Sequence, residues 1–209
     1  MVRFKLFFFL STNHQLSVPY ISLDILILLC YTFYMKNGMI HVYIGDGKGK
    51  TTAAMGLGIR AAGSGSKVHL TQFLKDGNSN ELKCLRLLEN FSLSDAPKSL
   101  PFCFQMTDDE KKRYKEYAAT LFNEAKQLVK RGEVQLVILD EVLDAVLLNI
   151  ISENDLICLL NERADDVEIV LTGRQASDRI LEIADYVSKM QKEKHPYDKG
   201  VMAREGIEW

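Results

Sequence analysis

The sequence has few residues that could form a structural metal site or a disulfide framework. Its four cysteines are scattered along 209 residues without a CxxC pair, and its four histidines are likewise unclustered. Zinc sites and disulfide-stapled domains need closely spaced ligands or paired cysteines. We therefore expect no protein-bound transition metal, and we expect the chain to work in the reducing cytoplasm.

The chain also lacks an excess of charge of either sign. Its 26 Lys and Arg residues stand against 28 Asp and Glu residues, which gives a formal net charge of -2. Proteins that wrap nucleic acid usually present a strongly basic face, so we expect no nucleic-acid partner. Hydrophobic residues make up 47% and charged residues 26%, which is typical of a soluble globular domain.

No hydrophobic run is long enough to be a clear membrane span. Residues 1–38 contain apolar stretches, but the longer one, 25–34, is well short of the roughly 20 residues that cross a bilayer. A signal peptide and a membrane tether stay open as alternatives. We favour a third interpretation, a mis-assigned start with translation beginning at Met35 or Met39. We expect 1–38 to be an apolar extension and 39–209 to be the domain.

From residue 39 onward, short apolar runs alternate with longer helical segments. This alternation is typical of a parallel sheet with helices on both faces. The expected strands are 39–44, 67–73, 133–139, 168–171 and 186–190, and the expected helices are 50–62, 78–90, 108–131 and 177–184. Thr107 with Glu110 has capping-box spacing and predicts the start of the longest helix, and Gly132 predicts its end.

A glycine-rich loop with the sequence GDGKGKTT connects the first expected strand to the first expected helix. Its residues are Gly45, Asp46, Gly47, Lys48, Gly49, Lys50, Thr51 and Thr52. Backbone N–H groups of such a loop converge on phosphate oxygens, and larger side chains would block the approach. We expect Lys50 to contact phosphate and the Thr51 hydroxyl to coordinate Mg²⁺ or Mn²⁺.

This loop is a shortened variant of the P-loop, because Ile44 stands where the full Walker pattern has its first glycine. An ordinary glycine turn is the alternative, but the flanking strand and helix favour a nucleotide site. The predicted fold is therefore α/β of the P-loop NTPase (RecA-like) class, a three-layer sandwich with a mostly parallel sheet.

Two carboxylates follow the apolar run that predicts a buried strand over 133–139. Asp140 and Glu141 would lie at the carboxyl end of this strand, where ligands bind in open α/β sheets. The alternative is a pair of acids at a helix N-terminus, and both roles can coexist. We assign metal binding to Thr51, Asp140 and Glu141, and a catalytic role to Lys50, Thr51 and Glu141.

Four further residues are weaker candidates for binding. Phe102 and Phe104 would point the same way in a strand, although such a pair is more often part of a core. Arg60 and Arg174 are candidate anion contacts, with surface salt bridges as the alternative for each.

Five stretches of the sequence together resemble one family, the P-loop-type corrinoid adenosyltransferases. They are GDGKGKTTAA at the loop, QFLK at 72–75, LDE at 139–141, LTGR at 171–174 and KHPYDKGVMAREGIE from residue 194. The resemblance covers Met39 to Trp209. It implies transfer of the 5′-deoxyadenosyl group of ATP to the cobalt of a reduced corrinoid, cobalamin or cob(I)yrinic acid a,c-diamide, with release of triphosphate in adenosylcobalamin synthesis or salvage.

The same resemblance implies roles for individual residues. Lys48 would add a second charge at the phosphates, and Arg60 would match an arginine on the corrinoid or nucleotide side. Phe102 and Phe104 match an aromatic element that presses on the lower face of the corrinoid and displaces its axial ligand. The resemblance further implies a homodimer and an electron-donating flavoprotein reductase as partner.

The implied reaction suits a chain without a convincing catalytic triad. Co(I) is itself a strong nucleophile, so the protein has to orient the two substrates and stabilise the departing triphosphate. Two alternatives stay open. A small P-loop kinase or ATPase would release ADP or phosphate and would need a base. A non-catalytic regulatory module would bind ATP without altering the spectrum of a reduced corrinoid.

Overall fold

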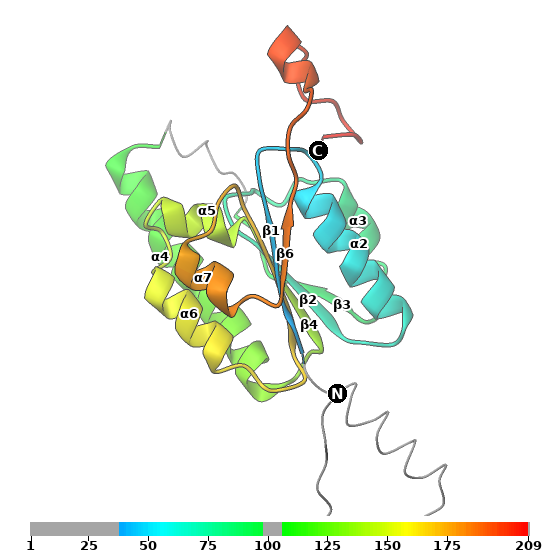
Figure 1. The fold of residues 1–209 in the computed structure, drawn as a ribbon, viewed down its shortest axis with the longest axis vertical. Helices are drawn as coiled ribbons and strands as arrows, with labels where there is room; N and C mark the ends of the chain where they lie inside the picture. Colours follow the sequence, from blue (N-terminus) through cyan, green and yellow to red (C-terminus); the bar gives the residue numbers. More distant parts are fainter. Residues whose placement is uncertain (1–37, 98–105, 209) are drawn as a thin grey trace, which may run out of the picture. The chain divides into compact units, whose positions relative to one another are not determined.

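The computed structural model describes residues 38–97 and 106–208. The predictions for the N-terminal extension up to residue 37 and for Phe102 and Phe104 lie outside the described residues. Within them, the chain folds around a sheet of six parallel strands (Figure 1). The predicted α/β class is confirmed, and the sheet is wholly parallel rather than mostly so.

The strands stand in the order β3-β2-β4-β5-β1-β6 across the sheet. Their bounds are β1 (Ile40–Ile44), β2 (Val68–Gln72), β3 (Phe91–Leu93), β4 (Leu136–Asp140), β5 (Glu168–Thr172) and β6 (Tyr186–Lys189). All five residues of β4 are buried, as the continuous apolar run predicted. The edge strand β6 is exposed along its whole length.

Helices cover both faces of the sheet, as a three-layer sandwich requires (Figure 1). Their bounds are α2 (Lys50–Gly63), α3 (Glu81–Leu85), α4 (Asp108–Arg131), α5 (Val142–Leu147), α6 (Glu153–Asn161) and α7 (Asp178–Ile183), with a short 3₁₀ helix η2 (Pro196–Lys199). Helices α2 and α3 share one apolar cluster with the sheet, and α4 to α7 share the other. No described helix carries an apolar stretch long enough to cross a bilayer.

One expected helix was wrong in its bounds, and one strand and two α-helices were not predicted. The helix expected over 78–90 is limited to the five residues of α3, and the chain then forms β3, which was not predicted. Helices α5 and α6 were also not predicted. The leucines of 78–90 have helical spacing, but Phe91 is buried under α2 as part of a strand three residues long. So short a strand leaves no periodic pattern in the sequence.

The strand order brings four loops together at the carboxyl ends of the strands, which form one edge of the sheet. Strand β5 lies between β1, which precedes the glycine-rich loop, and β4, which ends in Asp140. Because all strands are parallel, the segments that follow β1, β2, β4 and β5 emerge at the same edge. This edge holds the candidate site.

Candidate functional site

Hydrogen bonds to neighbouring strand ends shape the glycine-rich loop. The Gly45 N–H donates to the Arg174 carbonyl at 3.0 Å, and the Gly47 N–H donates to the Met190 carbonyl at 2.8 Å. Gly45 has φ 120°, and a Cβ there would lie 2.1 Å from the Met190 oxygen, so only glycine fits. These two N–H groups therefore serve the loop itself, and the N–H groups at the start of α2 are left to face an anion.

Lys50, the first residue of α2, lies over this loop. Its ammonium donates to the carbonyls of Gly45 at 2.7 Å and of Gly47 at 2.9 Å. The cation is thus held at the mouth of the loop, where the sequence predicted a phosphate contact. The phosphate role of Lys50 stays a prediction.

Asp140 is the centre of a dense hydrogen-bond cluster at the end of β4. The side chain is fully buried, and its Oδ1 accepts from the hydroxyls of Thr51 at 2.9 Å and Thr172 at 2.7 Å. Its Oδ2 accepts from Gln72 Nε2 at 3.1 Å and from Lys75 Nζ at 2.7 Å. Burial alone raises the pKa of Asp140, but the Lys75 ammonium and the hydrogen bonds outweigh it and hold this pKa below its usual value.

Glu141 has a different environment from its neighbour. Burial, with help from the Asp140 and Asp144 carboxylates, raises the pKa of Glu141 to about 7, although Lys75 opposes this. Its backbone is left-handed, with φ 59°, and its N–H donates to the Thr172 hydroxyl at 2.8 Å. Glu141 is the N-cap residue of α5 and makes no side-chain capping hydrogen bond, so the alternative of an acid at a helix N-terminus rests on its charge alone.

Lys75 joins the site although the sequence had not predicted it as a site residue. Its ammonium lies 2.7 Å from Asp140 Oδ2, 3.3 Å from Thr51 Oγ1 and 3.8 Å from Glu141 Oε1. Burial lowers the pKa of Lys75, but the carboxylates of Asp140 and Glu141 raise this pKa by more than burial lowers it. The side chain therefore stays an ammonium. Leu74, with φ 57°, turns the chain after β2 and directs Lys75 back to the site. In the sequence, Lys75 stood out only as part of the stretch QFLK.

The oxygen atoms at the end of β4 fit a magnesium ion. The Thr51 hydroxyl and the Asp140 and Glu141 carboxylates are hard ligands of the kind that Mg²⁺ prefers, and the ammonium of Lys75 already lies among them. In residues 38–97 and 106–208, no three His, Cys, Asp or Glu side chains gather as a metal-binding group. Mg²⁺ does not require such a group, because it is usually held by one or two carboxylates together with substrate phosphates and water.

The C-terminal tail contacts the glycine-rich loop from the opposite end of the chain (Figure 1). Lys48 Nζ lies 2.9 Å from Glu208 Oε1, and the guanidinium of Arg204 binds the same carboxylate. Arg204, and then Lys48, hold the pKa of Glu208 well below its usual range. Asp46 Oδ1 accepts the Lys192 N–H at 3.1 Å. Asp46 and Lys48, both predicted at the nucleotide, thus pair with the tail.

Three other predicted residues, Arg60, Thr52 and Arg174, have different placements. Arg60 is exposed in the last turn of α2, ten residues after Lys50, which is about 15 Å along the helix axis. The structure does not bring it to the loop. Thr52 is exposed in the first turn of α2. Arg174 supports the site through its backbone, because its carbonyl accepts from Gly45 and its N–H donates to Asp144 Oδ2.

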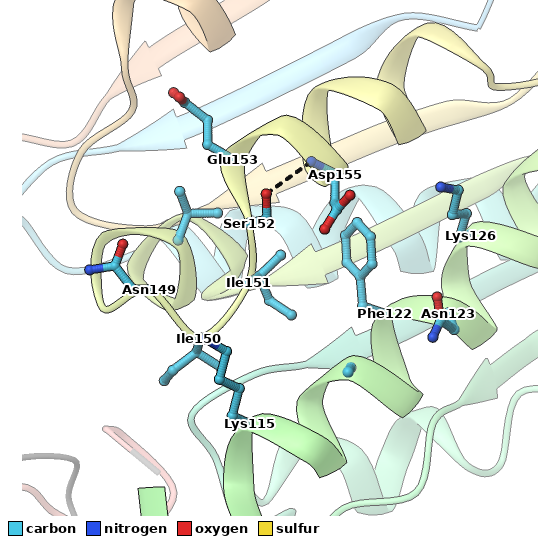
Figure 2. A pocket seen from close by; sticks show the side chains of 12 residues that line it. Lys115, Phe122, Asn123, Lys126, Asn149, Ile150, Ile151, Ser152, Glu153 and Asp155 are labelled. Atoms are coloured by element: carbon cyan, nitrogen blue, oxygen red, sulfur yellow. Dashed lines mark hydrogen bonds between the residues drawn. The ribbon is translucent and has the colours of Figure 1, made fainter. Parts of the chain in front are cut away.

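A separate groove of about 550 Å³ lies between α4 and the α5–α6 connection (Figure 2). Phe122, Ile150 and Ile151 provide apolar lining, and Lys115 and Asp155 are among its polar residues. Figure 2 shows the Ser152 hydroxyl at the start of α6 capping the N–H of Asp155 rather than facing a partner across the groove. None of the predicted site residues lines this groove.

The fold and the site together define a P-loop nucleotide-binding protein. A strand leads through a glycine-rich loop into a helix, and the hydroxyl of Thr51 meets the carboxylate of Asp140 from a second strand. This is the arrangement that holds a nucleotide phosphate and its metal ion.

The chain belongs to the family described as ATP:corrinoid adenosyltransferase BtuR/CobO/CobP, whose profile matches residues 36–209. The corrinoid adenosyltransferase of Escherichia coli (strain K12) is 35% identical over 176 residues, which are 83% of this chain and 87% of that protein. Corrinoid adenosyltransferase CobA of Salmonella typhimurium is 32% identical over the same shares of the two chains. The corrinoid adenosyltransferase of Pseudomonas aeruginosa is 31% identical, covering 83% and 85%. The family resemblance predicted from the five motifs is confirmed.

Proposed function

We propose that this protein transfers the 5′-deoxyadenosyl group of ATP to the cobalt of a reduced corrinoid and releases triphosphate. The observation that carries this proposal is the contact between Thr51 and Asp140 beside the glycine-rich loop, in a chain whose family uses ATP and a corrinoid. The site can hold a triphosphate with its metal ion. The Ser–His contacts that His69 makes with Ser92 and Ser94 involve no residue of the glycine-rich loop or of the Asp140 cluster, so they do not suggest a protein nucleophile at this site.

The protein contributes position and charge to this reaction. The electron pair of Co(I) forms the bond to C5′, the C5′–O bond breaks, and its electron pair leaves with the triphosphate. The loop and the N-terminus of α2 hold the triphosphate, and Lys50 neutralises part of its charge. Thr51, Asp140 and Glu141 would hold Mg²⁺ (or Mn²⁺), which when bound stabilises negative charge on phosphate oxygens.

Further parts of the proposal rest on the family resemblance. Phe102 and Phe104 would displace the lower axial ligand of the corrinoid, Lys48 and Arg60 would contact substrate, and a flavoprotein reductase would supply electrons. We also propose a cytoplasmic homodimer. The exposure of Tyr186 and Val187 on the edge strand β6, 52% and 49%, supports an interface between copies. The domain would span 39–209, preceded by the apolar N-terminal extension 1–38.

The direct test combines the purified protein with ATP, Mg²⁺ and chemically reduced cobalamin under anaerobic conditions. We expect the absorbance spectrum to change from that of Co(I) to that of the alkylated corrinoid, and only when ATP is present. A spectrum that does not respond to ATP, with ATP still bound, would instead favour the non-catalytic regulatory module.

A further inference from the structure

The ammonium of Lys75 lies among the oxygens to which we assign the metal ion. Thr51 Oγ1, Asp140 Oδ2 and Glu141 Oε1 are 3.3, 2.7 and 3.8 Å from Lys75 Nζ. Asp140 does not need a lysine to provide it with hydrogen-bond donors, because its carboxylate already accepts hydrogen bonds from three other side chains. Lys75 therefore adds a positive charge at the centre of the site beyond the hydrogen bonds that Asp140 already receives.

We propose that Lys75 is a further catalytic residue, which competes with the metal ion for Asp140 and binds the triphosphate once the metal ion is in place. The inference rests on the proposed function, because it names the reaction's leaving group as the second partner of Lys75. Lys75 transfers no proton in this role, so the bonds formed and broken remain those of the transfer itself.

The hydrogen bonds of Asp140 indicate which of its donors a metal ion would displace, and this donor is Lys75. Four donors occupy its two oxygens, so a metal ion that binds this carboxylate has to replace one of them. Gln72 and Thr172 are buried side chains of β2 and β5, with 8% and 1% exposure. Lys75 is 21% exposed and ends a flexible four-carbon stem, so it can leave at the least cost.

The place to which Lys75 can move is limited by its backbone. Leu74 is held by the hydrogen bond from its N–H to the Tyr114 hydroxyl at 2.6 Å, so the Lys75 stem starts from a defined position. From there its ammonium already reaches Thr51, in the first turn of α2 beside the loop. A triphosphate held by that loop is the nearest new anion, and its negative charge increases as the C5′–O bond breaks.

The test compares Lys75→Met with Lys67→Met, which removes the charge of an exposed lysine before β2 and serves as the matched control. Binding of Mn²⁺ without nucleotide is followed by electron paramagnetic resonance, and binding of magnesium tripolyphosphate by calorimetry. For Lys75→Met we expect Mn²⁺ to bind about tenfold more tightly and tripolyphosphate about tenfold or more weakly, as for loss of one charge-assisted hydrogen bond. Adenosylation should fall about 100-fold. Lys67→Met should match the wild type in all three.

Unchanged affinities for Mn²⁺ and tripolyphosphate in a folded Lys75→Met protein would overturn the proposal and leave Lys75 as a structural partner of Asp140. A second measurement needs no charge removal. In the ¹⁵N-lysine wild-type protein, the Lys75 ammonium signal, assigned with Lys75→Arg, should shift when Mg²⁺ is added and again with tripolyphosphate. A signal that ignores both additions would equally overturn the proposal.

These binding measurements contain no corrinoid, so they separate the two proposals. If Mn²⁺ and tripolyphosphate respond as expected while the wild-type protein does not adenosylate a reduced corrinoid, the proposed function fails and the role of Lys75 as a cation for triphosphate stands. If adenosylation is observed and Lys75→Met binds Mn²⁺ and tripolyphosphate with the same affinities as the wild type, only the inference about Lys75 fails.

Discussion

Lys50 shows how one side chain can serve the loop and its ligand at different times. Its ammonium donates hydrogen bonds to the carbonyls of Gly45 and Gly47. The positive charge therefore already lies beside the loop that would bind the phosphates, and it can turn to a bound triphosphate by exchanging these two hydrogen bonds.

Replacing Lys50 with alanine should abolish adenosylation while the fold remains. Removal of a charge placed at a developing oxyanion costs about 10²- to 10³-fold or more in turnover, whereas the fold loses only two hydrogen bonds, those to the carbonyls of Gly45 and Gly47. Turnover is measured from the corrinoid spectrum and folding from circular dichroism. Activity within tenfold of the wild type would refute the phosphate role of Lys50.

His69 is a buried titratable residue that the reaction does not use. It lies on β2, and its ring nitrogens contact the hydroxyls of Ser92 at 2.8 Å and Ser94 at 2.9 Å. Burial lowers the pKa of His69, although Glu124, which binds Ser94, opposes this. Below pH 6.5 the unfolded chain therefore binds a proton that the folded protein does not.

The stability that His69 provides should consequently be present above pH 6.5 and be lost as the pH falls below it. At pH 7.5, His69→Gln should be less stable by about 1–2 kcal/mol, because the serine contacts are lost. At pH 5.5 this difference should shrink by about 1 kcal/mol. Urea unfolding at both pH values measures it. A difference that stays constant would contradict the account, and His195→Gln in the C-terminal tail provides the control.

At this scale, the sequence was sufficient where a residue's role follows from its local neighbours. The sequence alone could predict that Thr51 and Asp140 lie together, because the glycine-rich loop and Asp140 each follow a strand, and parallel strands end on the same side of a sheet. Lys75 and Thr172 could not, since each reaches Asp140 only through the pairing of strands. Likewise, no pattern in the sequence indicates that Lys48 binds a carboxylate 160 residues away.

Among the elements, α4 is the clearest case of a helix defined by its own ends. The Thr107 hydroxyl accepts from the Glu110 N–H, the Glu110 carboxylate accepts from the Thr107 N–H, and Gly132 ends the helix with φ 61°. Its buried face then packs on the sheet through residues such as Tyr114 and Leu121. Capping box, C-terminal glycine and helix length were all predicted correctly.

Replacing Thr107 with alanine should destabilise the protein by about 1 kcal/mol, because the hydroxyl satisfies an N–H that the helix leaves unpaired. Thr120→Ala is the matched control, since Thr120 is exposed in the middle of α4 and alanine favours a helix. Denaturant unfolding of both variants measures the free energies. Equal stabilities would show that the cap contributes nothing to the folded state.

Other elements could not be predicted because tertiary contacts determine their lengths. The leucines at 82, 85 and 88 suggested a long helix, yet α3 stops at Leu85 and the chain soon pairs with β2 through Phe91. Helix α5 has six residues and starts from Glu141 in a left-handed conformation, so it presents neither a full apolar period nor a usual cap.

For the whole molecule, the alternation of strands and helices predicted the layers but not the order of the strands. Strand β5 lies between β1 and β4, and this placement allows Thr172, at the end of β5, to bind both Asp140 and the N–H of Glu141. The site therefore depends on four strand ends at once. Long-range pairings of this kind leave no local signal in one sequence.

The central claim is that the loop holds a leaving triphosphate rather than a phosphoryl group in transfer. Phosphorus NMR of the products, after the wild-type protein has consumed ATP in the presence of reduced cobalamin and Mg²⁺, tests it most directly. The account predicts intact inorganic triphosphate in a one-to-one ratio with the new cobalt–carbon bond. ADP with phosphate or with a phosphorylated acceptor would contradict it and would identify the protein as a P-loop kinase or ATPase.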